Sequence, residues 1–223
     1  MTFKIRQFFS LMTATIFALV SWFLCIDVAN SVYWRVWYFH SQKISIMWIG
    51  LWRFCYLQHS SNMQHKTVVC MQINSSWVYP IEFHYGKDLI TLPIFLQVTG
   101  MIFSLGAFLI IFKNEPYPHF IDTCHLIAGC CFILSSISVG VSVTWNTYMD
   151  LRGHSTLEFP RQFPVKMNKI TKREIGLSFP MGISSAASSF ISGIFFFCQT
   201  CCSKLSRIHP QSRHPIRKLI TDT

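Results

Sequence analysis

The chain contains four long stretches without a single Asp, Glu, Lys or Arg, and these limit its possible folds more than any other feature. They cover residues 7–26, 89–112, 123–149 and 175–203. A helix rises about 1.5 Å per residue, so about 20 residues cross a hydrocarbon core of roughly 30 Å. Charged residues make up 13% of the chain, against about one quarter in an ordinary soluble domain. The pattern predicts four transmembrane helices, at about residues 8–27, 91–112, 121–146 and 175–199.

These helices divide a single domain, residues 1–223, into external loops at 28–90 and 147–174 and a tail at 200–223. With four uncleaved spans both termini lie on one side, and Lys4, Arg6 and the basic tail place that side in the cytoplasm. The first span could instead be a cleaved signal peptide, but its apolar run exceeds the usual length of about 7–15 residues and no A-x-A site follows. Because the external loops are also basic, charge alone does not fix the orientation.

The cysteines provide the second line of evidence on topology. Of nine cysteines, Cys55 and Cys70 fall in the first external loop, and the others lie in or beside predicted helices. Alternation at residues 50–57 and an apolar run at 67–71 predict two strands joined by a polar turn, which would bring the two cysteines side by side. Disulfides persist in oxidising compartments. We therefore expect a Cys55–Cys70 disulfide outside the cell, with two free thiols as the alternative.

Two kinds of modification site follow from short motifs. Asn74-Ser75-Ser76 is a tripeptide that accepts N-linked sugars in secreted loops. Cys198, Cys201 and Cys202 lie at the expected cytoplasmic end of the fourth helix, where cysteines are candidates for palmitoylation. They fit equally well as ordinary cysteines at the membrane boundary.

Motifs for chemistry are scarce, which favours a structural protein over an enzyme and predicts no cofactor. Asp122 and His125 lie one turn apart and could pair or bind a proton, although an acid at a helix start is explained by the helix dipole. His40, His59 and His65 could bind zinc weakly, but scattered loop histidines are more often exposed. The basic tail would attract anionic lipid head groups of the inner leaflet, and nucleic acid is excluded as its partner.

A tryptophan, a Gly-Leu-Trp triplet and two cysteines follow one another in the first external loop. These residues are Trp34, Gly50, Leu51, Trp52, Cys55 and Cys70, and Arg35 follows the first of them. With this pattern the chain resembles the claudin family, as a divergent member. The resemblance implies a membrane α+β fold, a left-handed four-helix bundle with an extracellular antiparallel β-sheet formed by both external loops. It also implies a plasma-membrane protein of tight junctions that assembles with itself and other claudins, in cis and in trans, as a paracellular barrier.

Several features depart from the family pattern. Fourteen residues separate the two cysteines, more than is usual, and Gly100 stands where an arginine is expected. The second external loop is long for the family. The chain ends in Thr221-Asp222-Thr223 without an apolar last residue, which argues against docking to PDZ scaffolds.

The charge of the external loops bears on ion selectivity. Beyond Asp27 they hold eleven basic residues against five acidic ones, so a pore would favour anions. Met71, which follows the second cysteine, is neutral, and a barrier fits the sequence equally well. Two alternatives stay open: a protein like peripheral myelin protein 22 or the epithelial membrane proteins, which forms no junction strands, and an auxiliary channel subunit of the same superfamily.

Overall fold

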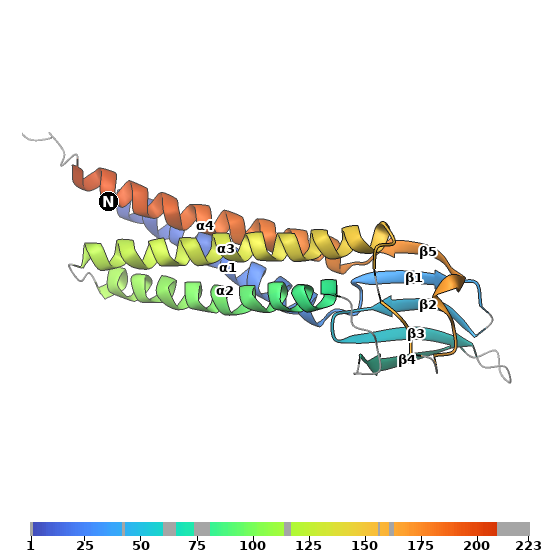
Figure 1. Cartoon of the computed structure of the whole chain (residues 1–223). Coiled ribbons are helices and arrows are strands. Elements are labelled where there is room, and N and C mark those ends of the chain that lie inside the picture. The colour runs from blue at the N-terminus through green and yellow to red at the C-terminus, as the bar shows by residue number, and fades with distance from the viewer. Residues whose placement is uncertain are drawn as a thin grey trace, which may run out of the picture.

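The computed structural model is a bundle of four long helices with a β-sheet at one end (Figure 1). It describes residues 2–41, 43–59, 66–73, 81–113, 117–155, 157–160 and 163–208. The helices are α1 (Thr2–Asn30), α2 (Ile81–Lys113), α3 (Pro118–Leu151) and α4 (Ser178–Ile208). The N-terminus lies at the end of the bundle away from the sheet (Figure 1).

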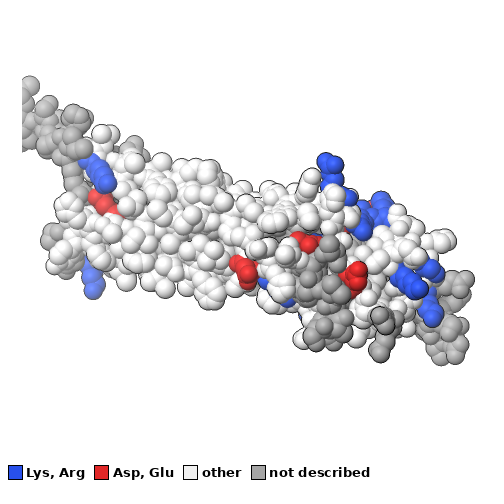
Figure 2. Space-filling model, in the orientation of Figure 1, with Lys and Arg blue, Asp and Glu red and all other residues white. Residues whose placement is uncertain are grey.

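All four helices are long and apolar enough to cross a membrane, which confirms the four predicted spans. On the face that Figure 2 shows, the coloured charged side chains lie towards the two ends of the molecule, and the helical middle carries none. Many exposed positions on the helices carry large apolar side chains, such as Phe95, Ile102 and Phe190. A surface of this kind is stable only in hydrocarbon.

Three helices, α1, α2 and α3, extend beyond the predicted spans at the sheet end, and α4 begins later than predicted. α2 begins at Ile81 rather than at residue 91, and α3 continues to Leu151 rather than ending at 146. The added turns carry Glu82, Lys87 and Asp88 on α2, because helix hydrogen bonding continues outside the bilayer, where a charged side chain can reach water or a polar partner. α4 begins at Ser178 rather than at the predicted residue 175, because Ile175 is the last residue of a β-strand.

A polar cluster joins the four helices inside the bundle. Gln97 Nε2 on α2 donates to Ser135 Oγ on α3 at 2.6 Å and to Ser21 Oγ on α1 at 3.1 Å. Ser21 Oγ in turn donates to the Ser185 carbonyl on α4 at 2.9 Å. Small polar residues of this kind let helices approach closely and bond across the apolar interior.

The sheet has five antiparallel strands in the order β4-β3-β2-β1-β5. They are β1 (Arg35–Phe39), β2 (Ile44–Ile49), β3 (Arg53–His59), β4 (Lys66–Gln72) and β5 (Ile170–Ile175). The first four come from the first external loop and β5 from the second, so both loops form the extracellular sheet, as predicted. The predicted hairpin of residues 50–57 and 67–71 corresponds to β3 and β4, with Gly50 in the preceding turn.

Alternation along the strands gives the sheet two unlike faces. The inner face carries Trp37, Phe39, Met47, Phe54 and Tyr56, all buried. Residues 157–167 of the second external loop, described except for 161 and 162, run across this face; we call them the strap. The strap's Phe159 packs on Trp37 and Phe39, and its Phe163 packs on Phe54 and Tyr56. The long second loop therefore closes one face of the sheet with the chain's own side chains.

Candidate functional site

The tryptophan and the Gly-Leu-Trp triplet singled out in the sequence lie where the sheet meets the bundle. Trp34 is buried, and its ring Nε1 donates to the carbonyl of Val28 in α1 at 2.9 Å. This bond fixes the direction in which the chain leaves the helix and enters β1. Leu51 is fully buried in the core shared by sheet and helices. Trp52 is 45% exposed, and the Lys87 ammonium of α2 lies 4.4 Å from the centre of its ring.

Two glycines permit the tight passage of the segment that links α1 to β1. A Cβ at Gly50 would lie 2.4 Å from the carbonyl oxygen of Ser31. A Cβ at Gly176, in the turn between β5 and α4, would lie 1.8 Å from the carbonyl oxygen of Tyr33. Backbone atoms cannot move aside as a side chain can. Residues 31–34 are thus clamped between two glycines from distant parts of the sequence.

Arg35 is the centre of a buried polar network, which we call the junction network. Its guanidinium donates to Asn146 Oδ1 on α3 at 2.7 Å and to Ser155 Oγ at 2.6 Å. Its Nη2 lies 3.6 Å from Glu82 Oε1 on α2, and the guanidinium lies 4.4 Å from the centre of the Phe83 ring. Arg35 is 1% exposed and Glu82 3% exposed, so solvent screens this pair only weakly.

The junction network continues along the inner face of β1. The Trp37 ring donates to Asp150 Oδ1 at 2.9 Å, and Arg173 of β5 donates to the Asp150 carbonyl at 2.8 Å. Burial lowers the pKa of Arg35, and the carboxylates of Asp150 and Glu82 oppose that shift. The network therefore ties β1 and β5 to α2 and α3 and fixes the orientation of the sheet on the bundle.

The sequence signalled Arg35 only through the family pattern, and it missed the partners. Glu82 and Asp150 were counted among the charges of the external loops, yet both are buried in the junction network. A paired charge in a loop looks the same in a sequence as a solvated one. The signal that could have found these partners is their position in the chain. Glu82 lies at the start of α2, Asn146 and Asp150 lie near the end of α3, and these two helix ends face one another.

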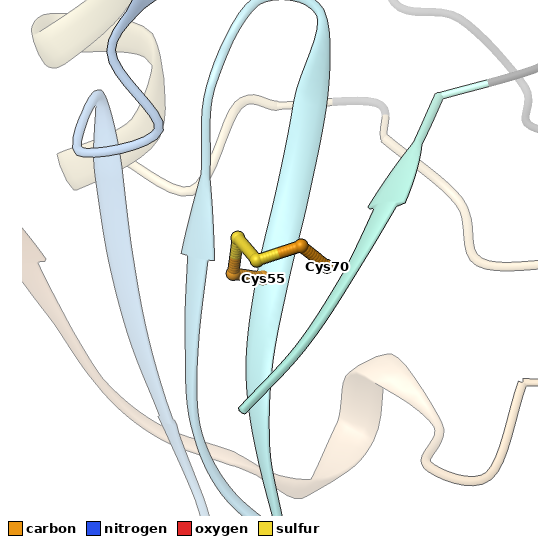
Figure 3. Close-up of a disulfide and its surroundings, with 2 residues drawn as sticks. All are labelled: Cys55 and Cys70. Atoms are coloured by element: carbon orange, nitrogen blue, oxygen red, sulfur yellow. A yellow bond between two sulfur atoms is a disulfide. The ribbon is translucent and has the colours of Figure 1, made fainter. Parts of the chain in front are cut away.

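Cys55 on β3 and Cys70 on β4 form the predicted disulfide (Figure 3). They are direct partners in the register of the two strands, with Cα atoms 4.1 Å apart. The bond joins the edge strand β4, whose side chains are mostly exposed, to the better buried β3. By the chain-entropy account, closing a loop of this size stabilises the fold by about 3 kcal/mol.

Replacing Cys55 by Ser is expected to release β4 and to prevent delivery of the protein to the cell surface. The edge strand would keep its backbone hydrogen bonds to β3, but the free energy of unfolding would fall by about 3 kcal/mol because the cross-link is absent. Surface biotinylation of cells expressing the variant measures delivery. Cys130→Ser is the matched control, because Cys130 is a free, exposed thiol on α3. Normal delivery of Cys55→Ser would contradict a stabilising role for the bond.

Other predicted site residues take different positions. Cys198, Cys201 and Cys202 are free and exposed on α4, at the end of the bundle opposite the sheet. Asn74 and His65 lie outside the described residues, as does the terminal Thr221-Asp222-Thr223. Among the residues that the structure describes, no group of three His, Cys, Asp or Glu side chains could hold a metal ion.

The outer face of the sheet differs in character from the inner one. It carries a band of partly exposed apolar side chains, which we call the outer band: Val36, Tyr38, Ile46, Trp48, Leu57 and Val68. Val68 on the edge strand is 58% exposed. At the β5 edge, the Tyr38 hydroxyl and the Lys172 ammonium both bind the Glu174 carboxylate. The hydrogen bonds from Lys172 and Tyr38 lower the pKa of Glu174, so it stays ionised at neutral pH.

Comparison with known proteins gives a consistent result over most of the chain. Residues 8–198 match the family model described as PMP-22/EMP/MP20/Claudin tight junction. Claudin-3 of Rattus norvegicus is 26% identical over 190 residues, which cover 83% of this chain and 80% of the relative. Human claudin-3 is 25% identical over 190 residues, with the same two coverages. Claudin-4 of Bos taurus is 26% identical over 190 residues, covering 82% of each protein.

Proposed function

Because this chain belongs to the PMP-22/EMP/MP20/Claudin family, we propose that it is a structural component of tight junctions, with the role of a claudin. It sits in the plasma membrane, where copies assemble side by side and meet claudins of the opposite cell. The role is structural rather than enzymatic. The observation that carries the proposal is the extracellular sheet, stapled by Cys55–Cys70 and fixed to four spans by the junction network. A rigid platform of this kind holds a contact surface at a constant height and angle above the membrane.

We infer that the assembled contact works as a barrier with a weak preference for anions. Arg35, Glu82 and Asp150 are buried, and the two carboxylates offset the positive charge of the guanidinium. The surface charge of the sheet region is therefore dominated by exposed Lys43, Arg53, Lys66, Lys166 and Lys169. Exposed Glu158 offsets one of these charges, and Lys172 is paired with Glu174. The net positive charge repels cations over a Debye length of about 8 Å. The apolar outer band provides little that would replace the hydration shell of an ion, which favours a seal over a wide pore.

The tail and the last helix fit the inner leaflet of the membrane. Exposed Lys204 on α4 and the basic residues beyond it attract anionic lipid. Cys198, Cys201 and Cys202 are exposed, and acylation there would anchor the end of the helix. We propose them as palmitoylation sites.

Expression in fibroblasts that lack junctions tests the function directly. Continuous fibrils in freeze-fracture replicas at cell contacts are expected, together with higher electrical resistance in a leaky epithelial layer. Dilution potentials on the same layers should show chloride permeating at least as well as sodium. Delivery to the surface without fibrils would favour a protein like peripheral myelin protein 22. Recovery in a stable complex with a channel would favour the auxiliary subunit.

A further inference from the structure

The strap already covers the inner face of the extracellular sheet, so contacts between the sheet and other molecules fall on the outer face. The strap covers the inner face through Phe159 and Phe163. The outer band remains partly exposed across β1 to β4. In the strand register Val36 lies beside Trp48, Tyr38 beside Ile46 and Leu57 beside Val68. These residues form one continuous apolar area rather than isolated side chains.

The charges around the outer band have one dominant sign. Arg53 lies on the outer face of β3 at its bundle end, and Lys66 lies on the outer face of β4 at the far end. Both side chains are exposed. Lys172 at the opposite edge is neutralised by Glu174, the acidic residue on the outer face of β5. The rim of the band is therefore positive through Arg53 and Lys66.

A positive rim bears on which partner the outer band accepts. Two copies meeting through this face would bring like charges together around an apolar centre, which disfavours that pairing. A partner with an acidic rim would gain attraction and a faster encounter. We propose that the outer face docks the extracellular domain of a different membrane protein, one whose apolar contact patch is rimmed by carboxylates. The proposal rests on the cell-contact function above and adds that this contact is heterophilic.

The charge-reversed double variant Arg53→Glu with Lys66→Glu supplies a probe with an acidic rim on the same scaffold. Differently labelled cells express the full-length wild type or this variant and are mixed, and enrichment at contacts is measured. Wild type facing the variant is expected to exceed wild type facing wild type by roughly tenfold, the lower end of electrostatic steering. Variant facing variant should be as weak as wild type facing wild type. The difference should shrink as ionic strength rises.

Two further variants serve as tests of the outer face. One tests whether the effect depends on the position of the charge rather than on the total charge, and the other tests whether it needs direct contact rather than long-range attraction. Lys166→Glu with Lys169→Glu changes the total charge equally, but at two exposed positions near the end of the strap, one within it and one just after it. This control should face wild type as wild type does. Val68→Ser in the wild-type partner should reduce contact with the acidic variant, because it removes an exposed part of the outer band.

The outcomes that overturn the inference differ from those that overturn the proposed function. Wild type enriching against itself as strongly as against the acidic variant, with fibrils formed, would sink the heterophilic inference alone. Enrichment that depends on heparinase-sensitive glycans of the opposite cell, whatever it expresses, would assign the basic rim to polysaccharide and also sink it. Absence of both fibrils and enrichment for every pair would refute the contact function itself.

Discussion

Gly176→Ala is expected to abolish surface delivery, with a loss of more than about 3 kcal/mol in folding stability, beyond the usual range for overpacking. The added methyl carbon would lie 1.8 Å from the Tyr33 carbonyl oxygen and 2.5 Å from its carbonyl carbon. Both are backbone atoms of the segment that connects α1 to β1. That segment cannot retreat, because Gly50 contacts Ser31 and Val32 from another side. Surface biotinylation and thermal unfolding of the detergent-purified chain measure the effect.

Gly106→Ala is the matched control for this prediction. Among the described residues, no atom outside the local helix lies within 4 Å of a Cβ at Gly106 on α2. Alanine is favoured over glycine in a helix by up to about 1 kcal/mol, so this variant should be delivered as wild type or slightly better. If Gly176→Ala unfolded at the wild-type temperature, the clamp around residues 31–34 would not exist as described.

The two glycines show where sequence reasoning succeeded and where it stopped. Gly50 belonged to the family pattern, but nothing in the sequence showed that it and Gly176 close on the same four residues. The spans were predictable because hydrocarbon tolerates almost no charge, so the gaps between charges mark them. The disulfide was predictable because one external loop held the pair. Both the spans and the disulfide depend on local sequence and on the medium that surrounds that segment, so a sequence alone is enough to predict them.

The remaining features depend on contacts between distant segments. The helical turns of α2 before residue 91 carry charges, as a loop does, and length arguments apply only inside the bilayer. The strap looked like a long polar loop, although Leu157 and Val165 are buried against the sheet. The charge count of the external loops treated Glu82 and Asp150 as solvated. These interpretations failed where tertiary packing moved a loop residue into the core.

Arg35→Met is expected to destabilise the fold by about 3–5 kcal/mol, the cost of breaking a buried charge pair by removing one partner. Methionine fills much of the space, so the loss comes from what the guanidinium leaves behind. Glu82 would stay buried without its cation, and it would keep only the hydrogen bond that Ser155 Oγ donates to it at 2.8 Å. Asn146 and Asp150 would lose the same cation. Arg35→Lys should recover only part of the loss, because an ammonium cannot bond Asn146 and Ser155 in the same fork.

A double-mutant cycle distinguishes this electrostatic origin from lost packing. Adding Glu82→Gln to Arg35→Met removes the stranded carboxylate, so the double variant should be less destabilised than the sum of the two single changes. The expected coupling is about 1–3 kcal/mol, within the range for residues in one network. Lys43→Met is the control, since Lys43 is exposed on the turn between β1 and β2 and should change stability by less than about 0.5 kcal/mol. Additive effects in the cycle would mean that Arg35 holds the sheet by its contact with Phe83 rather than by its charge.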